Sequence, residues 1–223
     1  MFSTILFDLD GTLLDTSPGI FATANLTMGE LGYDAIPPHR LRTFVGPPLA
    51  DCFRIAGQLP EEQILPAIAI YRKKYAEGGM FDATPYEGIP EVLLELKARG
   101  CALGVATLKH EGVAREVLDF FGIRPHLDTL AGSDDSGNMT KGDIIKLALV
   151  RMGVTDASTV VMVGDTSLDQ QGALDAGVAF IGVDYGFGFP PDHQLPPKGG
   201  VLGMVRKPKE ILSLLACQVS VDQ

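Results

Sequence analysis

The feature that most constrains the fold is the stretch of residues 2–17, where an apolar run leads directly into two carboxylates. Residues 5–7 (Ile-Leu-Phe) are typical of a short strand buried on both faces of a parallel sheet. Asp8 and Asp10 follow, and their spacing predicts side chains on one side of the chain, because residues two apart on a strand share a face. Ligands of open α/β sheets bind at the carboxyl ends of the strands. The stretch therefore predicts an acidic functional site at a sheet edge.

After residue 85 the hydrophobic pattern alternates between strands and helices. Predicted strands span 101–106, 127–131, 159–163 and 178–183, and predicted helices span 90–99, 113–121, 143–152, 169–176 and 208–216. Such alternation implies parallel strand pairing. We therefore predict an α/β fold with a doubly wound, parallel, Rossmann-like sheet. The Gly/Pro-rich segment 186–200 has no periodicity, and the sequence assigns it no role.

The segment between Asp15 and Gly79 has no strand pattern. Helices are predicted near 18–31, 40–44, 49–56 and 61–77, and Pro66 is expected to kink or split the last of them. This pattern indicates an all-helical cap inserted into the sheet domain. We predict a core of residues 1–14 and 84–223 and a cap of residues 15–83.

Composition excludes several classes of function. A net charge of -10 argues against nucleic acid and anionic membranes as partners, because both favour basic surfaces. No apolar run approaches the roughly 20 residues that span a bilayer, and no signal peptide pattern opens the chain. Cys52, Cys101 and Cys217 match no zinc or redox spacing and are expected to be reduced. A cytoplasmic protein, monomeric or homodimeric, is expected.

Polar residues also follow later apolar runs and one turn. They are Thr107-Leu108-Lys109, Thr140-Lys141-Gly142-Asp143, and Gly164-Asp165-Thr166-Ser167-Leu168-Asp169. Together with Asp8-Leu9-Asp10-Gly11-Thr12, these segments resemble the four motifs of the haloacid dehalogenase (HAD) superfamily, in the same chain order. The resemblance covers nearly the whole chain and implies a HAD core with a helical C1-type cap.

The resemblance also implies a role for each motif residue. Asp8 is expected to be the nucleophile and Asp10 the general acid and base. Thr107 and Lys141 are expected to hold and neutralise the phosphoryl group. Mg²⁺ is expected on Asp8, the backbone carbonyl of Asp10, and Asp165, with Asp169 as a further ligand or as an orienting residue. Clustered carboxylates without His or Cys favour Mg²⁺ over zinc.

Simpler interpretations stay open for several of these residues. Thr107 is equally compatible with a plain strand end. Taken alone, Lys141 is more typical of a solvated lysine at a helix start, and Lys109 is expected to face solvent. Asp169 is also compatible with a residue that only favours the positive end of its helix. Further candidate substrate contacts are Gly11, Thr12, Leu108, Lys109, Arg54 and His39. The segment Val45-Gly46-Pro47-Pro48-Leu49 resembles a cap turn of phosphoglycolate phosphatases or acts as a rigid connector.

Two motifs depart from the common family pattern. Leu108 replaces the frequent Asn, and Gly142 replaces the Pro that often follows the motif lysine of phosphoglycolate phosphatases. With the segment Gly132-Ser133 to Gly137-Asn138, this resembles 5'-nucleotidase-like relatives.

We predict a Mg²⁺-dependent phosphatase of a small phosphorylated metabolite, phosphoglycolate-like or a nucleoside monophosphate. A β-phosphoglucomutase-type phosphotransferase and a non-catalytic HAD-fold binding protein are the alternatives. Dehalogenation is disfavoured, since Asp10 and the metal ligands would then have no purpose.

Overall fold

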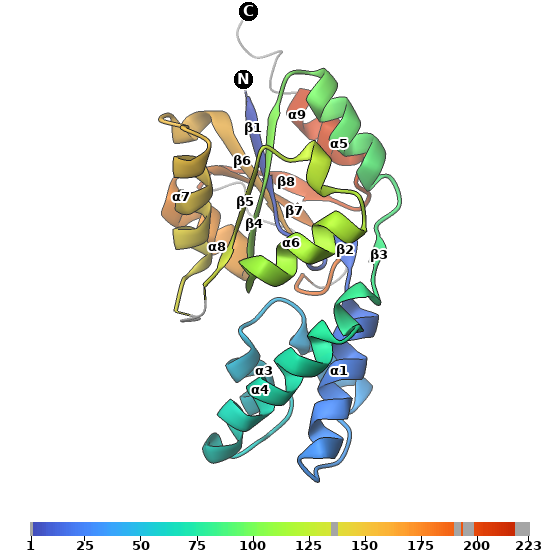
Figure 1. Ribbon diagram of the computed structural model, residues 1–223. Helices are drawn as coiled ribbons and strands as arrows, with labels where there is room; N and C mark the ends of the chain where they lie inside the picture. Colours follow the sequence, from blue (N-terminus) through green and yellow to red (C-terminus); the bar gives the residue numbers. More distant parts are fainter. Residues whose placement is uncertain (1, 135–137, 190–192, 194–198, 217–223) are drawn as a thin grey trace, which may run out of the picture.

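The apolar N-terminal run forms β1 (Thr4–Phe7), a fully buried strand near the centre of a six-stranded sheet (Figure 1). This computed structural model describes residues 2–134, 138–189, 193 and 199–216. The strand order is β5-β4-β1-β6-β7-β8, and every neighbouring pair is parallel. The other strands are β4 (Ala102–His110), β5 (Thr129–Ser133), β6 (Val160–Gly164), β7 (Ala179–Val183) and β8 (Val201–Val205). The predicted parallel α/β sheet is confirmed, whereas β8 was not predicted.

Helices cover both faces of the sheet, because alternate residues of each strand point to opposite sides. Ile5 and Phe7 pack in one buried cluster with α5, α6 and α9, whereas Leu6 packs in a second cluster with α7 and α8. The doubly wound arrangement is therefore confirmed. The helical elements are α5 (Ile89–Ala98), α6 (Glu111–Phe120), η3 (Arg124–His126), α7 (Lys141–Arg151), η4 (Ala157–Thr159), α8 (Ser167–Ala176) and α9 (Glu210–Ala216).

A group of helices stands apart from the sheet beyond its carboxyl edge (Figure 1). These elements are α1 (Ser17–Glu30), α2 (Pro38–Leu41), η1 (Arg42–Phe44), α3 (Leu49–Ile55), α4 (Glu61–Ala76) and η2 (Gly79–Phe81). Two short antiparallel strands, β2 (Leu14–Asp15) and β3 (Thr84–Pro85), join the helical cap to the core. The sequence pattern did not predict this pair. The cap boundaries at residues 15 and 83 stay a prediction.

Aromatic side chains form the interior of the cap. Phe44 packs edge-on against Phe53 with ring centroids 5.0 Å apart, and Tyr71 stacks on Tyr75 at 5.4 Å. Pro66 lies inside α4, which continues as one helix from Glu61 to Ala76, so Pro66 does not split the helix, and the alternative of a kink stays a prediction. Buried residues before and after Pro66 anchor the helix on both sides of the missing backbone hydrogen bond.

Within the described ranges, no helix is both long and apolar enough to cross a bilayer. Cys52 is buried and Cys101 is half-buried, and neither forms a disulfide bond among the described residues. The predictions that concern Cys217, Gly137 and residues 190–192 and 194–198 fall outside the described residues. The cytoplasmic location and the monomeric or dimeric state stay predictions.

Candidate active site

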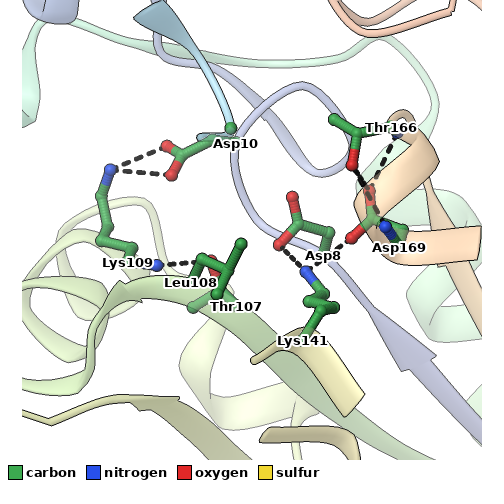
Figure 2. A pocket seen from close by; sticks show the side chains of 9 residues that line it. Asp8, Asp10, Thr107, Leu108, Lys109, Lys141, Thr166 and Asp169 are labelled. Atoms are coloured by element: carbon green, nitrogen blue, oxygen red, sulfur yellow. Dashed lines mark hydrogen bonds and ion pairs between the residues drawn. The ribbon is translucent and has the colours of Figure 1, made fainter. Parts of the chain in front are cut away.

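The carboxyl ends of β1, β4 and β6 meet the start of α7 and a loop of the cap around one small pocket (Figure 2). Its cavity volume of about 10 Å³ is near the minimum that holds one water molecule. The lining residues are Asp8, Asp10, Gly46, Thr107, Leu108, Lys109, Lys141, Thr166 and Asp169. The structure thus brings residues of all four sequence motifs to one edge of the sheet.

Lys141 links the first and last motifs. Its Nζ lies 2.6 Å from Oδ1 of Asp8 and 2.6 Å from Oδ1 of Asp169, and the lysine side chain is only 3% exposed. Burial alone would lower the pKa of Lys141, but the Asp169 and Asp8 carboxylates outweigh it and hold that pKa above its ordinary value. Lys141 is therefore a buried, charged group rather than a solvated helix-start lysine.

Asp169 uses both carboxylate oxygens within the protein. Oδ1 faces Lys141, while Oδ2 accepts hydrogen bonds from the backbone N–H of Thr166 at 2.9 Å and from its hydroxyl at 2.6 Å. These bonds form a capping box that begins α8, in which the Thr166 hydroxyl also accepts from the Asp169 N–H. Asp169 therefore caps the N-terminus of α8, and its ion pair also holds the ammonium group of Lys141 in position.

Asp165 is completely buried at the end of β6. Its Oδ2 accepts hydrogen bonds from the backbone N–H groups of Phe187 at 2.7 Å and Gly188 at 3.3 Å. The Thr12 hydroxyl donates a long hydrogen bond of 3.5 Å to Oδ1. Phe187 and Gly188 belong to the Gly/Pro-rich segment to which the sequence assigned no role. Their backbone amides carry no side-chain signal, so the sequence pattern indicates only a loop without periodicity.

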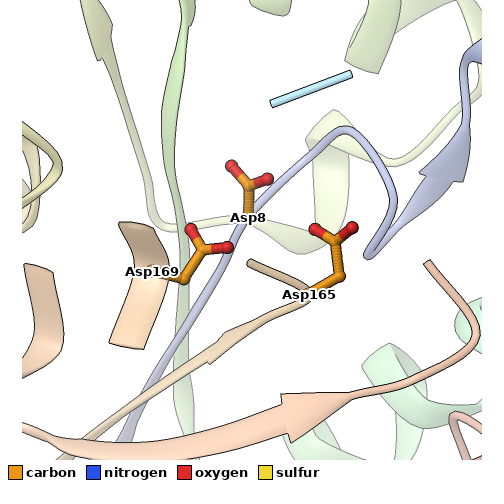
Figure 3. A group of neighbouring side chains, drawn as sticks. All are labelled: Asp8, Asp165 and Asp169. Carbon is orange, nitrogen blue, oxygen red and sulfur yellow. The ribbon is translucent and has the colours of Figure 1, made fainter. Parts of the chain in front are cut away.

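Asp8, Asp165 and Asp169 form a buried carboxylate cluster (Figure 3). One oxygen from each lies within 4.8 Å of the others. Burial, reinforced by the neighbouring carboxylates, raises the pKa of Asp8 to about 6, although Lys141 opposes the shift, and raises the pKa of Asp165 to about 8. A divalent cation would offset this repulsion, and an all-oxygen donor set matches Mg²⁺. The residues present therefore fit the metal that the family implies.

Lys109 is not solvent-facing, and that expectation is wrong. Its side chain is 9% exposed, and Nζ lies 2.8 and 2.9 Å from the two carboxylate oxygens of Asp10. The ammonium also lies 5.0 Å from the ring centroid of Tyr75 in the cap helix α4, a cation–π distance. Burial lowers the pKa of Lys109, but Asp10 and Tyr75 outweigh this effect. The pKa of Lys109 therefore lies above its ordinary value, and the lysine stays charged. Asp10 thus turns toward Lys109, whereas Asp8 turns toward Lys141 (Figure 2).

Thr107 and Leu108, which line the pocket, lie where β4 becomes irregular. The strand extends to His110, four residues beyond the predicted end, and its pairing with β5 shifts register between Ala106 and His110. Such a bulge re-aims side chains next to a site. The Thr107 hydroxyl accepts a hydrogen bond of 3.2 Å from the Lys109 N–H and is almost fully buried.

Other predicted contacts lie elsewhere. Gly11 and Thr12 lie beside Asp165 rather than on the pocket wall. Arg54 does not reach the pocket, because its guanidinium pairs with Asp51 at 2.6 Å and Glu61 at 3.0 Å on an exposed surface of the cap. His39 is exposed and is also absent from the pocket wall.

Gly46 is the cap residue that lines the pocket, and sequence reasoning left its segment open between a cap turn and a connector. Its φ of +103° is a conformation that favours glycine. A Cβ there would lie 3.2 Å from the Thr166 Cγ2. The cap loop therefore approaches the catalytic edge closely, and it does so through a residue without a side chain.

Gly11→Ala is expected to destabilise the protein by at least about 1–2 kcal/mol, because Gly11 has φ +82° and an added Cβ would lie 2.3 Å from Oδ2 of Asp165. Urea unfolding measures this change. Gly29→Ala is the matched control, since this exposed helical glycine has nothing within 4 Å and should gain stability. Equal effects of the two substitutions would contradict the argument that the left-handed backbone and the nearby Asp165 exclude a side chain at Gly11.

Comparisons with known proteins identify the family of this chain. The model of the family described as haloacid dehalogenase-like hydrolase matches residues 5–183. A 5'-nucleotidase of Pseudomonas aeruginosa is 38% identical over 84% of this chain and 85% of its own. A phosphoglycolate phosphatase of Caulobacter vibrioides is 29% identical over 96% of this chain and 92% of its own.

A solved structure extends the comparison to nearly the whole fold. Protein tyrosine kinase A (PtkA) of Mycobacterium tuberculosis superposes with a TM-score of 0.80 and 30% identity, covering 98% of both chains. The resemblance drawn from the four sequence motifs is confirmed. The chain belongs to the haloacid dehalogenase-like hydrolase family and is a phosphatase of that family.

Proposed function

We propose that this protein is a Mg²⁺-dependent phosphomonoesterase that cleaves a small phosphorylated metabolite through an aspartyl-phosphate on Asp8. The observation that carries the proposal is the buried contact of Asp8 with Lys141 beside the carboxylates of Asp165 and Asp169. One Asp8 oxygen is held by the lysine, so the carboxylate is fixed in orientation. A fixed carboxylate next to a cation is suited to nucleophilic attack on phosphorus.

In the first step an oxygen of Asp8 attacks phosphorus, and the bond between phosphorus and the leaving oxygen breaks. Asp10, which lines the same pocket, gives its proton to that leaving oxygen. Lys141 and the Thr107 hydroxyl stabilise charge on the transferred phosphoryl oxygens. The approach of Lys109 to Asp10 means that this ion pair must loosen before Asp10 can act as an acid.

In the second step Asp10 accepts a proton from a water molecule, whose oxygen attacks phosphorus. The bond between Asp8 and phosphorus breaks, so the free carboxylate and inorganic phosphate are released. Asp8, the backbone carbonyl of Asp10, and Asp165 would hold Mg²⁺, with Asp169 as the residue that orients Lys141. When bound, Mg²⁺ supplies positive charge that offsets both the carboxylate cluster and the arriving phosphate.

We propose that the cap, residues 15–83, selects the substrate. Gly46 lines the pocket, and the cavity beneath it holds about one water, so the cap and core must separate before a phosphate ester can enter. We propose that Leu108 and Lys109, which line the pocket from the core side, contact the leaving group. Phosphoglycolate and nucleoside monophosphates are the two candidate classes, because relatives of this chain are named phosphoglycolate phosphatase and 5'-nucleotidase.

A screen of phosphorylated metabolites with added Mg²⁺ tests the proposal. Phosphate release from phosphoglycolate, nucleoside monophosphates and sugar phosphates is measured with and without EDTA. We expect release from at least one class and loss of release with EDTA. Isomerisation of glucose 1-phosphate without phosphate release would support the phosphotransferase alternative. No turnover of any phosphate ester, with metal present, would support a binding protein and contradict the proposal.

A further inference from the structure

The loop that follows β7 encloses Asp165 on several sides. Besides the two N–H groups that donate to the Asp165 carboxylate, the backbone N–H of Phe189 donates to its carbonyl oxygen at 2.9 Å. The hydroxyl of Tyr185 donates to the carbonyl of Thr12 at 3.2 Å, which ties the start of the loop to the turn after β1. The residues 185–189 thus form a cradle for Asp165, a name we use for them below.

Two glycines allow the cradle to approach this closely. A Cβ at Gly186 would lie 2.4 Å from the Cβ and Oδ2 atoms of Asp165 and 2.4 Å from the carbonyl oxygen of Gly11. A Cβ at Gly188 would lie 2.7 Å from the carbonyl oxygen of Asp165 and 2.8 Å from the Cα of Thr166. Backbone atoms cannot yield as a flexible side chain can, so a larger residue at Gly188 must displace the cradle. The orientation of Asp165 therefore depends on the position of this loop.

Phe187 connects the cradle to the cap. Its backbone N–H donates to Asp165, while its ring meets Phe21 of the cap helix α1 edge-on, with centroids 6.5 Å apart and planes at 74°. This separation lies within the range at which aromatic rings attract each other. Both rings pack against the same buried cluster, which includes cap and core residues. One residue therefore contacts the cap through its ring and Asp165 through its backbone.

We propose that Phe21 and Phe187 are positioning residues for Asp165, so that the seating of cap helix α1 raises the affinity of the core for its divalent cation. This inference rests on the proposed function, since it requires a cation at Asp165. The carboxylate is held at Oδ2 by an N–H of Phe187, and a shift of that residue rotates or releases the carboxylate. Loss of the Phe21 ring removes a contact that keeps Phe187 in place. Neither ring touches the reacting atoms.

The test measures the dissociation constant for Mg²⁺ by isothermal titration calorimetry, with Mn²⁺ as a second probe. Phe21→Ala and Phe187→Ala are each expected to weaken Mg²⁺ binding by about 2- to 10-fold, the range that one edge-to-face aromatic pair supports. The double substitution should weaken binding no more than the stronger single one, because both remove the same contact. Gly188→Ala, which displaces the backbone directly, should weaken binding as well.

Phe120→Ala is the matched control. Phe120 of α6 packs against Phe81 of η2 with centroids 4.4 Å apart, so it also joins core to cap, but the contacts of the cradle do not involve it. Unchanged Mg²⁺ affinity in Phe120→Ala, with reduced affinity in Phe21→Ala, is the expected result. Equal losses in both would overturn the inference, because general loosening of the cap would then explain them. If Phe21→Ala does not fold, Phe21→Leu replaces it in the test, because leucine keeps an apolar side chain but removes the aromatic ring.

The outcomes also separate this inference from the proposed function. If the parent protein neither binds Mg²⁺ nor releases phosphate from an aryl phosphate, the proposed function fails. If the parent does both and Phe21→Ala and Phe21→Leu bind Mg²⁺ as tightly as the parent, only the inference about Phe21 fails. If the losses of Mg²⁺ affinity in Phe21→Ala and Phe187→Ala multiply in the double substitution, the two rings act independently. That result would contradict a shared route through Phe187.

Discussion

Asp8→Asn is expected to lower the turnover of an aryl phosphate by at least about 10⁴-fold, the scale on which loss of a covalent nucleophile acts in other enzymes. The amide keeps the shape of the carboxylate but is too weak a nucleophile to attack phosphorus. Its oxygen can still accept a hydrogen bond from Lys141, which lies 2.6 Å from Oδ1 of the native residue. Steady-state phosphate release measures the effect.

The fold of Asp8→Asn should stay intact. Burial raises the pKa of Asp8 from 3.8 to about 6, so without a cation the ionised carboxylate destabilises the folded state as the pH rises from about 4 to 6, and in full above that. A neutral amide avoids this cost. We therefore expect the free energy of unfolding in EDTA to stay near that of the parent protein. Asp51→Asn applies the same change to a cap residue whose side chain is 49% exposed and should leave turnover unaffected. Near-parent turnover in Asp8→Asn would contradict the covalent mechanism.

Lys141→Met is expected to lower the free energy of unfolding by about 3–5 kcal/mol in EDTA, because it leaves buried carboxylates without their cationic partner. Asp8 and Asp169 each lose an ion pair of 2.6 Å. Turnover should fall by about 10²–10³-fold as well, since charge on the phosphoryl group is no longer neutralised. Urea denaturation with and without Mg²⁺ measures the first effect.

Added Mg²⁺ should restore part of the lost stability, because a divalent cation also offsets the carboxylate charge. Lys146→Met is the matched control, as this lysine lies on the same helix but is exposed. Its unfolding free energy should change by less than about 0.5 kcal/mol. A similar stability for Lys141→Met and Lys146→Met would mean that the buried ion pairs contribute little.

The sheet and the polar strand ends could be predicted because their signals are local. The run before Asp8 has the apolar density of a central strand, and Asp165 follows another such run. The carboxyl ends of parallel strands meet at one edge, so the convergence of these residues follows from topology. The helical character of the cap was equally local, since its apolar residues recur at helical spacing.

The features that were missed depend on contacts distant in sequence. Lys109 is buried because Asp10 and the ring of Tyr75, both distant in sequence, contact its ammonium group. The residues next to Lys109 in the sequence do not indicate this burial. The Phe187 and Gly188 amides act through the backbone, which carries no residue-type signal. β8 contains a central Gly203, which lowers strand propensity, and its pairing with β7 determines its structure.

The pairing of β2 with β3 bears on how such an enzyme can change its substrate. Leu14 lies opposite Pro85, so the chain leaves the sheet domain and returns to it at adjacent points. The segment between β2 and β3 is therefore one long loop of the sheet domain. The entropic cost of closing a loop grows only slowly with its length. The segment can therefore be lengthened, shortened or exchanged over evolutionary time while the chemical machinery beneath it keeps its spacing.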